Sequence, residues 1–279
     1  MPNYIPYLIL TVLSITILIL TIVHKRDLGI IVLFLSYSGM VYVAEFFVMI
    51  IGNCYVYYPK VLSIPYYDNV LGAIVSNLFV IPVLGVVTAV YQLKFRWFVL
   101  FAFTLTGVSW LFEWLDIYRV NWWRKGYTFF SILIFMSLAK YWMRALQVGV
   151  KWIRFLSLWM QGWAEAATVM YIMSVVFIRH YEYGFFENIF RDDIFISGIM
   201  GMFKGLIFAA GVIFFRKFRW RLLAPVFVYS IDLPLYFLGV LVVKIPFGLY
   251  TIVYIVLATL LLLWNQYAYS FFLKLKKDS

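Results

Sequence analysis

The chain has 279 residues, of which 66% are apolar and 13% charged, and its mean hydropathy is +0.96. A soluble domain carries about 45–50% apolar and about 25% charged residues, so this composition excludes a water-soluble globular protein. The net charge of +11 arises from Lys and Arg residues clustered between apolar runs, which is typical of membrane loops and argues against a nucleic-acid partner.

Apolar runs of membrane-spanning length recur along the whole chain. A run of about 20 residues crosses about 30 Å of hydrocarbon as a helix, and only a helix satisfies its own backbone hydrogen bonds in lipid. The sequence therefore predicts an all-α, polytopic membrane protein with about nine transmembrane helices. The predicted spans are 4–23, 29–52, 70–91, 97–115, 127–145, 155–178, 194–215, 222–243 and 247–270.

The charges around the first run predict the orientation. Met1–Pro6 carries no basic side chain, and His24, Lys25 and Arg26 follow the apolar stretch, so we expect a retained helix rather than a cleaved signal peptide. With the N-terminus outside, nine spans place most of the 23 Lys and Arg residues on the cytoplasmic side, as the positive-inside rule requires. The C-terminal tail is then cytoplasmic, and the expected location is a plasma membrane.

Short sequence patterns occur twice after the first helix. Lys94-Phe95-Arg96-Trp97 returns as Lys217-Phe218-Arg219-Trp220, Tyr127-Thr128 as Tyr250-Thr251, Cys54-Tyr55-Val56-Tyr57 as His180-Tyr181-Glu182-Tyr183, and Asp68-Asn69 as Asp192-Asp193. These matches predict one transmembrane helix (1–28) followed by two parallel four-helix repeat units (29–148 and 149–279). Chance similarity between low-complexity membrane sequences is the alternative.

Three motifs carry a resemblance to a known group of proteins. They are Tyr57-Tyr58-Pro59, Asp68-Asn69-Val70-Leu71-Gly72 and Trp122-Trp123-Arg124, all in the first four-helix unit. With them the chain resembles a family of uncharacterised multi-pass membrane proteins of endospore-forming Gram-positive bacteria. The resemblance implies a bacterial plasma membrane and no known chemistry, and the second unit lacks the proline and the Asn-x-Leu-Gly pattern.

Five ionisable residues fall within the predicted spans. They are Glu45, Glu113, Glu165, Lys204 and Asp232. Each would cost about 2.5–3.5 kcal/mol facing lipid, so each is expected to face the protein interior or water. Glu113 lies close to Asp116 at the outer end of its span and is interpreted as a boundary residue. The other four form the candidate intramembrane polar site.

Glu165, Lys204 and Asp232 all lie near mid-span and could pair. Pro234 removes a helical hydrogen bond beside Asp232, as in the broken helices that line transport sites. The alternative is an ion pair that only fixes packing around a kink. Gly201-Met202-Phe203-Lys204-Gly205 also has the small-xxx-small spacing that lets another helix approach closely.

The sequence gives no reason to expect a cofactor or a metal. One cysteine, Cys54, permits no internal disulfide, and two separated histidines, His24 and His180, argue against a bis-histidine centre. The acidic loop from Arg179 to Asp193 could bind a divalent cation, but its spacing follows no known loop motif, so a self-neutralising loop is favoured.

Three classes of function remain open. The first is transport of a small solute or of protons, with Glu45, Glu165 and Asp232 as sites and Lys204 as their partner. The second is a non-catalytic sensor, scaffold or assembly protein, whose protein partners the sequence does not identify. The third is a lipid-modifying enzyme in the membrane, which is less favoured because hydrolase and zinc-protease motifs are absent. No catalytic residue is assigned.

Overall fold

The computed structural model describes residues 1–275 of the chain, and most of them are helical. Seven helical segments are long and apolar enough to cross a membrane: Tyr4–Lys25, Ile30–Ile51, Pro65–Val90, Phe95–Trp114, Lys125–Val148, Ile189–Phe214 and Phe247–Lys274. The all-α prediction is therefore confirmed, together with several helices of membrane-spanning length. The last four residues of the tail expected in the cytoplasm, 276–279, lie outside the described residues.

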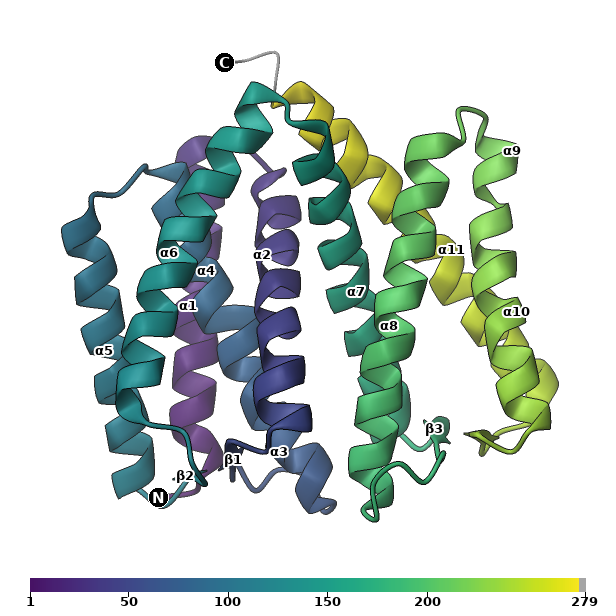
Figure 1. The fold of residues 1–279 in the computed structure, drawn as a ribbon, viewed down its shortest axis with the longest axis horizontal. Coiled ribbons are helices and arrows are strands. Elements are labelled where there is room, and N and C mark those ends of the chain that lie inside the picture. Colours follow the sequence, from purple (N-terminus) through teal and green to yellow (C-terminus); the bar gives the residue numbers. More distant parts are fainter. Residues whose placement is uncertain (276–279) are drawn as a thin grey trace. The chain divides into compact units, whose positions relative to one another are not determined.

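The chain forms two compact units, Met1–Val148 and the part from Gly149 onward. Unit 1 runs α1 (Tyr4–Lys25), α2 (Ile30–Glu45), η1 (Phe46–Ile51), β1 (Tyr55–Tyr57), α3 (Pro65–Ile74), η2 (Val75–Val80), α4 (Ile81–Val90), α5 (Phe95–Trp114), β2 (Tyr118–Val120) and α6 (Lys125–Val148). Unit 2 runs α7 (Lys151–Val175), β3 (Arg179–Tyr181), α8 (Ile189–Phe214), α9 (Phe218–Arg221), α10 (Leu223–Phe237), β4 (Leu241–Val243) and α11 (Phe247–Lys274). Within each unit successive long helices alternate in direction (Figure 1).

Two of the nine predicted spans are not among the seven apolar helices of membrane-spanning length. The predicted span 155–178 matches α7, which carries Lys151, Arg154 and Glu165 and is too polar to count among the seven apolar helices. The predicted span 222–243 is wrong at its end, because α10 stops at Phe237 and Leu241–Val243 is a strand. Gly239 has a φ of 75°, a left-handed conformation that ends the helix before β4.

Each unit contains one two-stranded antiparallel sheet, which the sequence did not predict. In unit 1, β1 pairs with β2, so the α2–α3 and α5–α6 connections meet at one end of the unit (Figure 1). In unit 2, β3 pairs with β4 and joins the α7–α8 and α10–α11 connections in the same way. Tyr57 pairs with Tyr118 in the first sheet, and Tyr181 pairs with Leu241 in the second.

In each unit, one carboxylate near the start of a helix binds the backbone of the connection that precedes this helix. Asp68 in α3 accepts backbone N–H bonds from Lys60, Val61 and Leu62 at 2.7–2.9 Å. Asp192 in α8 accepts four such bonds, from residues 183–186, at 2.6–3.2 Å. These bonds satisfy donors that a turn would otherwise leave unpaired at a helix N-terminus.

The next residue in each helix binds the neighbouring strand. Asn69 Oδ1 accepts the N–H of Tyr57 at 2.8 Å, and Asp193 Oδ1 accepts the N–H of Tyr181 at 2.7 Å. The sequence comparison aligned Tyr57 with Tyr183, but the hydrogen bonds give Tyr57 and Tyr181 the same role. The tyrosine alignment is therefore wrong by two residues, and its spacing becomes the 124 residues that also separate Asp68 from Asp192.

The helices of the two units pack in different ways. In unit 2, α7 and α8 meet at glycines, since a Cβ added at Gly205 would lie 2.5 Å from the backbone nitrogen of Trp163. This is the close approach that the small-xxx-small spacing predicts. In unit 1, Pro82 lacks the N–H that would bond Leu78 O. Ser38 Oγ on α2 donates to that carbonyl at 3.2 Å, and the preceding turn, η2, is a π-helix.

Candidate functional site

The four predicted site residues do not form a single cluster. Glu45 belongs to unit 1, and the other three belong to unit 2. Lys204 and Asp232 form an ion pair, as the sequence predicts, with Nζ 2.8 Å from Oδ2. Glu165 instead accepts a bond from Asn265 Nδ2 on α11 at 3.1 Å, and no ion pair joins it to Lys204 among the described residues. Glu113 pairs with Lys125 at the end of α5, consistent with a boundary role.

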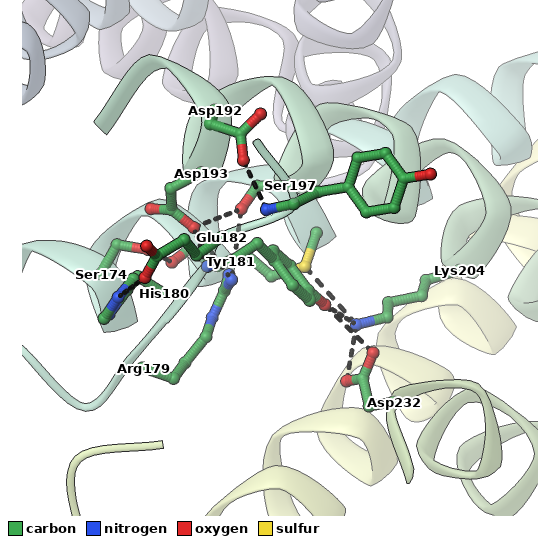
Figure 2. A network of polar contacts seen from close by, with 12 residues as sticks. Ser174, Arg179, His180, Tyr181, Glu182, Asp192, Asp193, Ser197, Lys204 and Asp232 are labelled. Carbon is green, nitrogen blue, oxygen red and sulfur yellow. Dashed lines mark hydrogen bonds and ion pairs between the residues drawn. The ribbon is translucent and has the colours of Figure 1, made fainter. Parts of the chain in front are cut away.

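The ammonium group of Lys204 has a complete set of partners. Besides Asp232, it lies 3.3 Å from the hydroxyl of Tyr181 and 3.5 Å from Sδ of Met170. Tyr181 in turn donates to the other carboxylate oxygen of Asp232 at 3.0 Å, so both groups converge on that residue (Figure 2). Lys204 and Asp232 are both buried. A buried ion pair with satisfied neighbours fixes packing and has no free capacity to bind a ligand.

Pro234 does not break the helix beside this pair. It lies inside α10 about one turn from its end at Phe237, and Asp232 remains within the helical segment. The comparison with the broken helices of transport sites therefore does not apply to this place. Pro234 cannot donate a bond to the carbonyl of Ser230, one turn earlier, yet α10 continues past it to Phe237.

The sequence did not predict a second buried pair, because Arg179 falls in a polar loop. Arg179 begins β3 and is 2% exposed, with Nη1 3.4 Å from Asp193 Oδ1 and 3.2 Å from Ser197 Oγ. Its guanidinium lies 4.5 Å from the centre of the Tyr181 ring. Neighbouring tyrosines and Asp193 outweigh desolvation and raise the pKa of Arg179, so the residue stays charged.

The acidic loop that could have held a divalent cation uses its carboxylates internally. Asp192 binds four backbone N–H groups and Asp193 binds Arg179 and Tyr181 N. Among residues 1–275, no group of three or more His, Cys, Asp or Glu side chains could hold a metal ion.

Glu165 lies in a polar cluster between α7 and α11. Asn265 bonds Oε2 of Glu165, whereas Oε1 of Glu165 and both polar atoms of the Gln161 amide are buried without a hydrogen bond of normal geometry. The cluster adjoins the glycine crossing, since a Cβ added at Gly162 would lie 3.5 Å from Asn265 Oδ1. None of the residues that line the pocket at Lys204 belongs to this cluster.

The pocket beside Glu45 in unit 1 has a volume of about 140 Å³. Its walls are apolar side chains, hydroxyl groups and four aromatic rings near the sheet, those of Tyr55, Tyr57, Tyr118 and Trp123. The pocket opens beside α6, where the lining residue Ser131 is exposed. An engineered protein cavity of about 150 Å³ binds benzene, so this pocket has room for a molecule of about six non-hydrogen atoms.

Glu45 is the only acidic residue that lines this pocket. Its Oε1 accepts a bond from the hydroxyl of Tyr55 at 2.5 Å, and its buried Oε2 has no hydrogen bond of normal geometry. None of the described residues that line the pocket is Lys, Arg or His, and no cation of the described chain lies within ion-pair distance of Glu45. The carboxylate of Glu45 therefore lacks the cationic partner that Asp232 has.

The tyrosines around the pocket are neutral hydrogen-bond donors. Burial raises the pKa of Tyr55 and of Tyr57 well above the ordinary value, and nearby carboxyl and phenol groups add to the shift. Burial, followed by the charges of Glu45 and Glu113, likewise raises the pKa of Tyr118. No negative charge arises on these rings near neutral pH, and their faces keep the electron density that attracts cations.

Both π-helical turns of unit 1 lie next to the pocket. η1 begins directly after Glu45, and η2 contributes Val75, Ser76 and Val80 to the lining. A π-turn inserts a residue into a helix at a cost in stability, and such turns are frequent at functional sites. In unit 2 the residues of α7 and α8 form uninterrupted α-helices, and the pocket at Lys204 has a volume of only about 30 Å³.

The sequence identified Glu45 from its place in a span but not the rings that surround it. Tyrosines are common at the membrane boundary, so their place next to predicted spans gave no sign of a pocket. The paired strands turn them toward Glu45, and strand pairing was not predicted. Comparisons with protein-family models, with curated proteins and with solved structures found no match.

Proposed function

We propose that this chain is a bacterial plasma-membrane protein that binds and transports a small solute, with the pocket beside Glu45 as the solute site. The observation that carries the proposal is an open pocket of about 140 Å³ that holds a carboxylate without a cationic partner. A buried charge is costly, and one that is held without a partner has a reason to be kept for binding.

An internal duplication supports a transporter architecture. Helix ends and starts recur at constant spacing: η1 and α7 end at Ile51 and Val175, and α3 and α8 begin at Pro65 and Ile189, each pair 124 residues apart. α5 and α10 end at Trp114 and Phe237, 123 residues apart. One helix followed by two parallel four-helix repeats is consistent with this order, as in parallel-repeat transporters.

Nine crossings follow if α7 and the α9–α10 segment also span the bilayer. Each alternates in direction with the apolar helix next to it in the chain (Figure 1). Seven or nine crossings both put the termini on opposite sides. Contacts support the orientation in unit 1, where Lys140 and Arg144 bind Gln92 and Lys25 stacks on Tyr91. This basic end is the cytoplasmic one by the positive-inside rule, so the sheet and the pocket lie toward the outside.

Reconstituted liposomes test the transport proposal. The full chain is compared with protein-free liposomes for uptake of a panel of small labelled solutes: an ammonium ion, a neutral amide and a carboxylate. We expect uptake of one class, and loss of that uptake in Ser131→Tyr, which puts into the pocket the ring that Tyr254 supplies in unit 2. Ser137→Tyr is the matched control, because Ser137 is exposed on the same helix and does not line the pocket beside Glu45.

Two results would contradict transport. Uptake no greater than in protein-free liposomes for every solute class would remove it, and so would equal uptake by wild type and Ser131→Tyr. A non-catalytic scaffold is the second candidate, and the closed polar network and glycine packing of unit 2 favour it. Co-purification of a fixed membrane partner, retained in Ser131→Tyr, would support this alternative.

A further inference from the structure

We propose that the pocket of unit 1 binds a small organic ammonium ion, whose charge is held by Glu45 and by the faces of the surrounding aromatic rings. The inference rests on the proposed solute site and names its substrate class. Three independent features of the described residues lead to it: an internal ammonium in unit 2, its absence at the corresponding place in unit 1, and the aromatic walls of that place.

Unit 2 shows how this fold accommodates an ammonium group. Nζ of Lys204 bonds Asp232 at 2.8 Å, lies 5.1 Å from the centre of the Tyr254 ring and lies 6.0 Å from that of Tyr181. A carboxylate and aromatic faces within about 6 Å are the two elements that stabilise a desolvated cation. The same pattern of groups, without the lysine, would be a receptor for an external cation.

Unit 1 has that pattern without the lysine. At the spacing of 124 residues, Lys204 corresponds to Val80, and at 123 residues Tyr254 corresponds to Ser131. Val80 and Ser131 both line the pocket of unit 1, whereas Lys204 and Tyr254 both line the small pocket of unit 2. The side chains that occupy this place in unit 2 are thus replaced by smaller ones in unit 1, and the space they leave is the pocket.

The carboxylate is supplied from a different helix in each unit. Glu45 on α2 corresponds to Val169 on α7, which lines the pocket of unit 2, and Asp232 on α10 corresponds to Ser109, which lines the pocket of unit 1. Both pockets therefore contain one acid, at two different wall positions. A site for an external cation requires an acid that has no internal cation beside it, and the pocket of unit 1 meets this requirement.

Four aromatic rings form the wall of the pocket nearest the sheet. The ring centre of Tyr55 lies 5.6 Å from that of Tyr57, 5.5 Å from that of Tyr118 and 5.7 Å from that of Trp123. The ring centres of Tyr57 and Tyr118 are 5.0 Å apart. Rings grouped in this way around an acid are the known recognition element for alkylated ammonium groups.

Other ligand classes fit less well. An anion would meet Glu45 and no basic side chain, and a hard metal cation needs about six oxygen ligands, whereas Glu45 is the only carboxylate in the lining. Lys125 lies 5.3 Å from the centre of the Tyr118 ring, but its ammonium binds Glu113 and the carbonyl of Ser109 and does not line the pocket. An internal lysine thus does not occupy the site.

Calorimetry on the detergent-solubilised full chain tests the class of ligand. The probes are choline and its uncharged isostere 3,3-dimethylbutan-1-ol, and choline is expected to bind at least about tenfold more tightly. Glu45→Gln should weaken choline binding by about tenfold or more, because the ring faces then act without the carboxylate. Asp116→Asn, on an exposed acid of the same unit that does not line the pocket, should leave the affinity unchanged. Equal affinity for the two probes, or no loss in Glu45→Gln, would overturn the inference.

A second variant tests the same idea without removing Glu45. Val80→Lys places in unit 1 the ammonium that Lys204 supplies in unit 2, so it should abolish choline binding while the variant remains as stable as wild type. Val80→Met, of similar length and without charge, should reduce affinity only through lost volume, and by less. Choline binding that survives in Val80→Lys, or falls equally in Val80→Met, would contradict a site for a cation.

Binding and transport can fail separately in these experiments. If choline binds as expected but no liposome takes up any solute, the ligand class stands and the transport proposal falls. If uptake is found for the neutral or the carboxylate solute and choline does not bind, the pocket transports another class of molecule and this inference falls.

Discussion

Unit 2 pairs its buried lysine with an acid of the same unit, whereas unit 1 holds a buried acid without a cation. Lys204 has Asp232, Tyr181 and Met170 as partners, and the space around it is small. Glu45 has the uncharged partners Tyr55 and Asn77, lines a pocket and has no cation. The difference teaches that position in a span does not distinguish a structural charge from a functional one, and that the number of internal partners does.

The backbones differ in the same direction. Unit 2 packs α7 on α8 through glycines in regular helices, which maximises contact. Unit 1 contains two π-turns where the corresponding residues of unit 2 are α-helical. A π-turn weakens a helix, so we expect unit 1 to be the less stable unit.

Breaking the ion pair of unit 2 should have the largest effect on stability. Lys204→Met or Asp232→Asn leaves a buried charge without its partner and should destabilise the protein by about 3–5 kcal/mol. The double variant should recover most of this loss. In unit 1, Glu45→Gln should leave stability unchanged or raise it. Denaturation in detergent, arranged as a double-mutant cycle, gives the coupling energy directly.

The contrast between the units fails if these stabilities are reversed. A single Lys204→Met variant as stable as wild type would show that the pair does not hold unit 2 together. A loss of several kcal/mol in Glu45→Gln would show that Glu45 is a structural charge as well.

Crowding the helix crossing of unit 2 should have the next largest effect. Gly205→Ala puts a Cβ within 2.5 Å of Trp163 N and 2.8 Å of the carbonyl carbon of Gly162, both rigid backbone atoms. Such overpacking costs about 1–3 kcal/mol. Gly248→Ala is the matched control in the same unit, because nothing lies within 4 Å of the added atom. Equal melting temperatures for the two variants would show that α7 and α8 can separate without cost.

The two loop carboxylates allow a direct comparison of the units. Asp192→Asn and Asp68→Asn each replace an acceptor oxygen with an amide group that faces backbone N–H donors. We expect a loss of about 1–3 kcal/mol in each case, and the larger loss for Asp192, which accepts four bonds against three. Hydrogen exchange at residues 60–62 and 183–186 should show which loop opens. Exchange unchanged in both variants would refute the role assigned to these carboxylates.

Sequence patterns predicted the helices because apolar length alone specifies them in lipid. They also predicted the Lys204–Asp232 pair and the close packing at Gly205, since a buried charge needs a partner and small residues permit contact. Strands β3 and β4 were missed because they directly follow apolar runs, and Leu241–Val243 has the hydropathy of a helix. The turn at Gly239 was the one local sign of a boundary.

The pocket could not be predicted, because it arises from pairing between distant segments. Tyr55 and Tyr118 are separated by a long stretch of chain and meet only through the β1–β2 sheet. Arg179 was likewise assigned to a solvated loop. Its burial is explained by the bond that it donates to Asp193 and by its contact with the ring of Tyr181. Aligning the tyrosines on the Asp68 and Asp192 spacing, rather than on the tyrosines themselves, would have indicated the correct register.

The smallest expected effect is on the labelling of cysteines, which tests on which side of the membrane the ends of the helices lie. Cys54 precedes β1, is 0% exposed and donates to Val48 O, and burial raises the pKa of its thiol to about 11. At pH 7 only on the order of one thiol in 10,000 is ionised, so a membrane-impermeant maleimide should not label native Cys54 from either side.

Because native Cys54 should not react, the natural chain can serve as an unlabelled background for a topology test. Trp122→Cys lies in the connection between β2 and α6 of unit 1 and should be labelled in intact cells, whereas Phe95→Cys, at the start of α5, should be labelled only after lysis. Labelling of Phe95→Cys in intact cells would invert the proposed orientation and place the pocket of unit 1 toward the cytoplasm. The pocket would then receive its solute from inside the cell, and the direction of the uptake assay would have to be reversed.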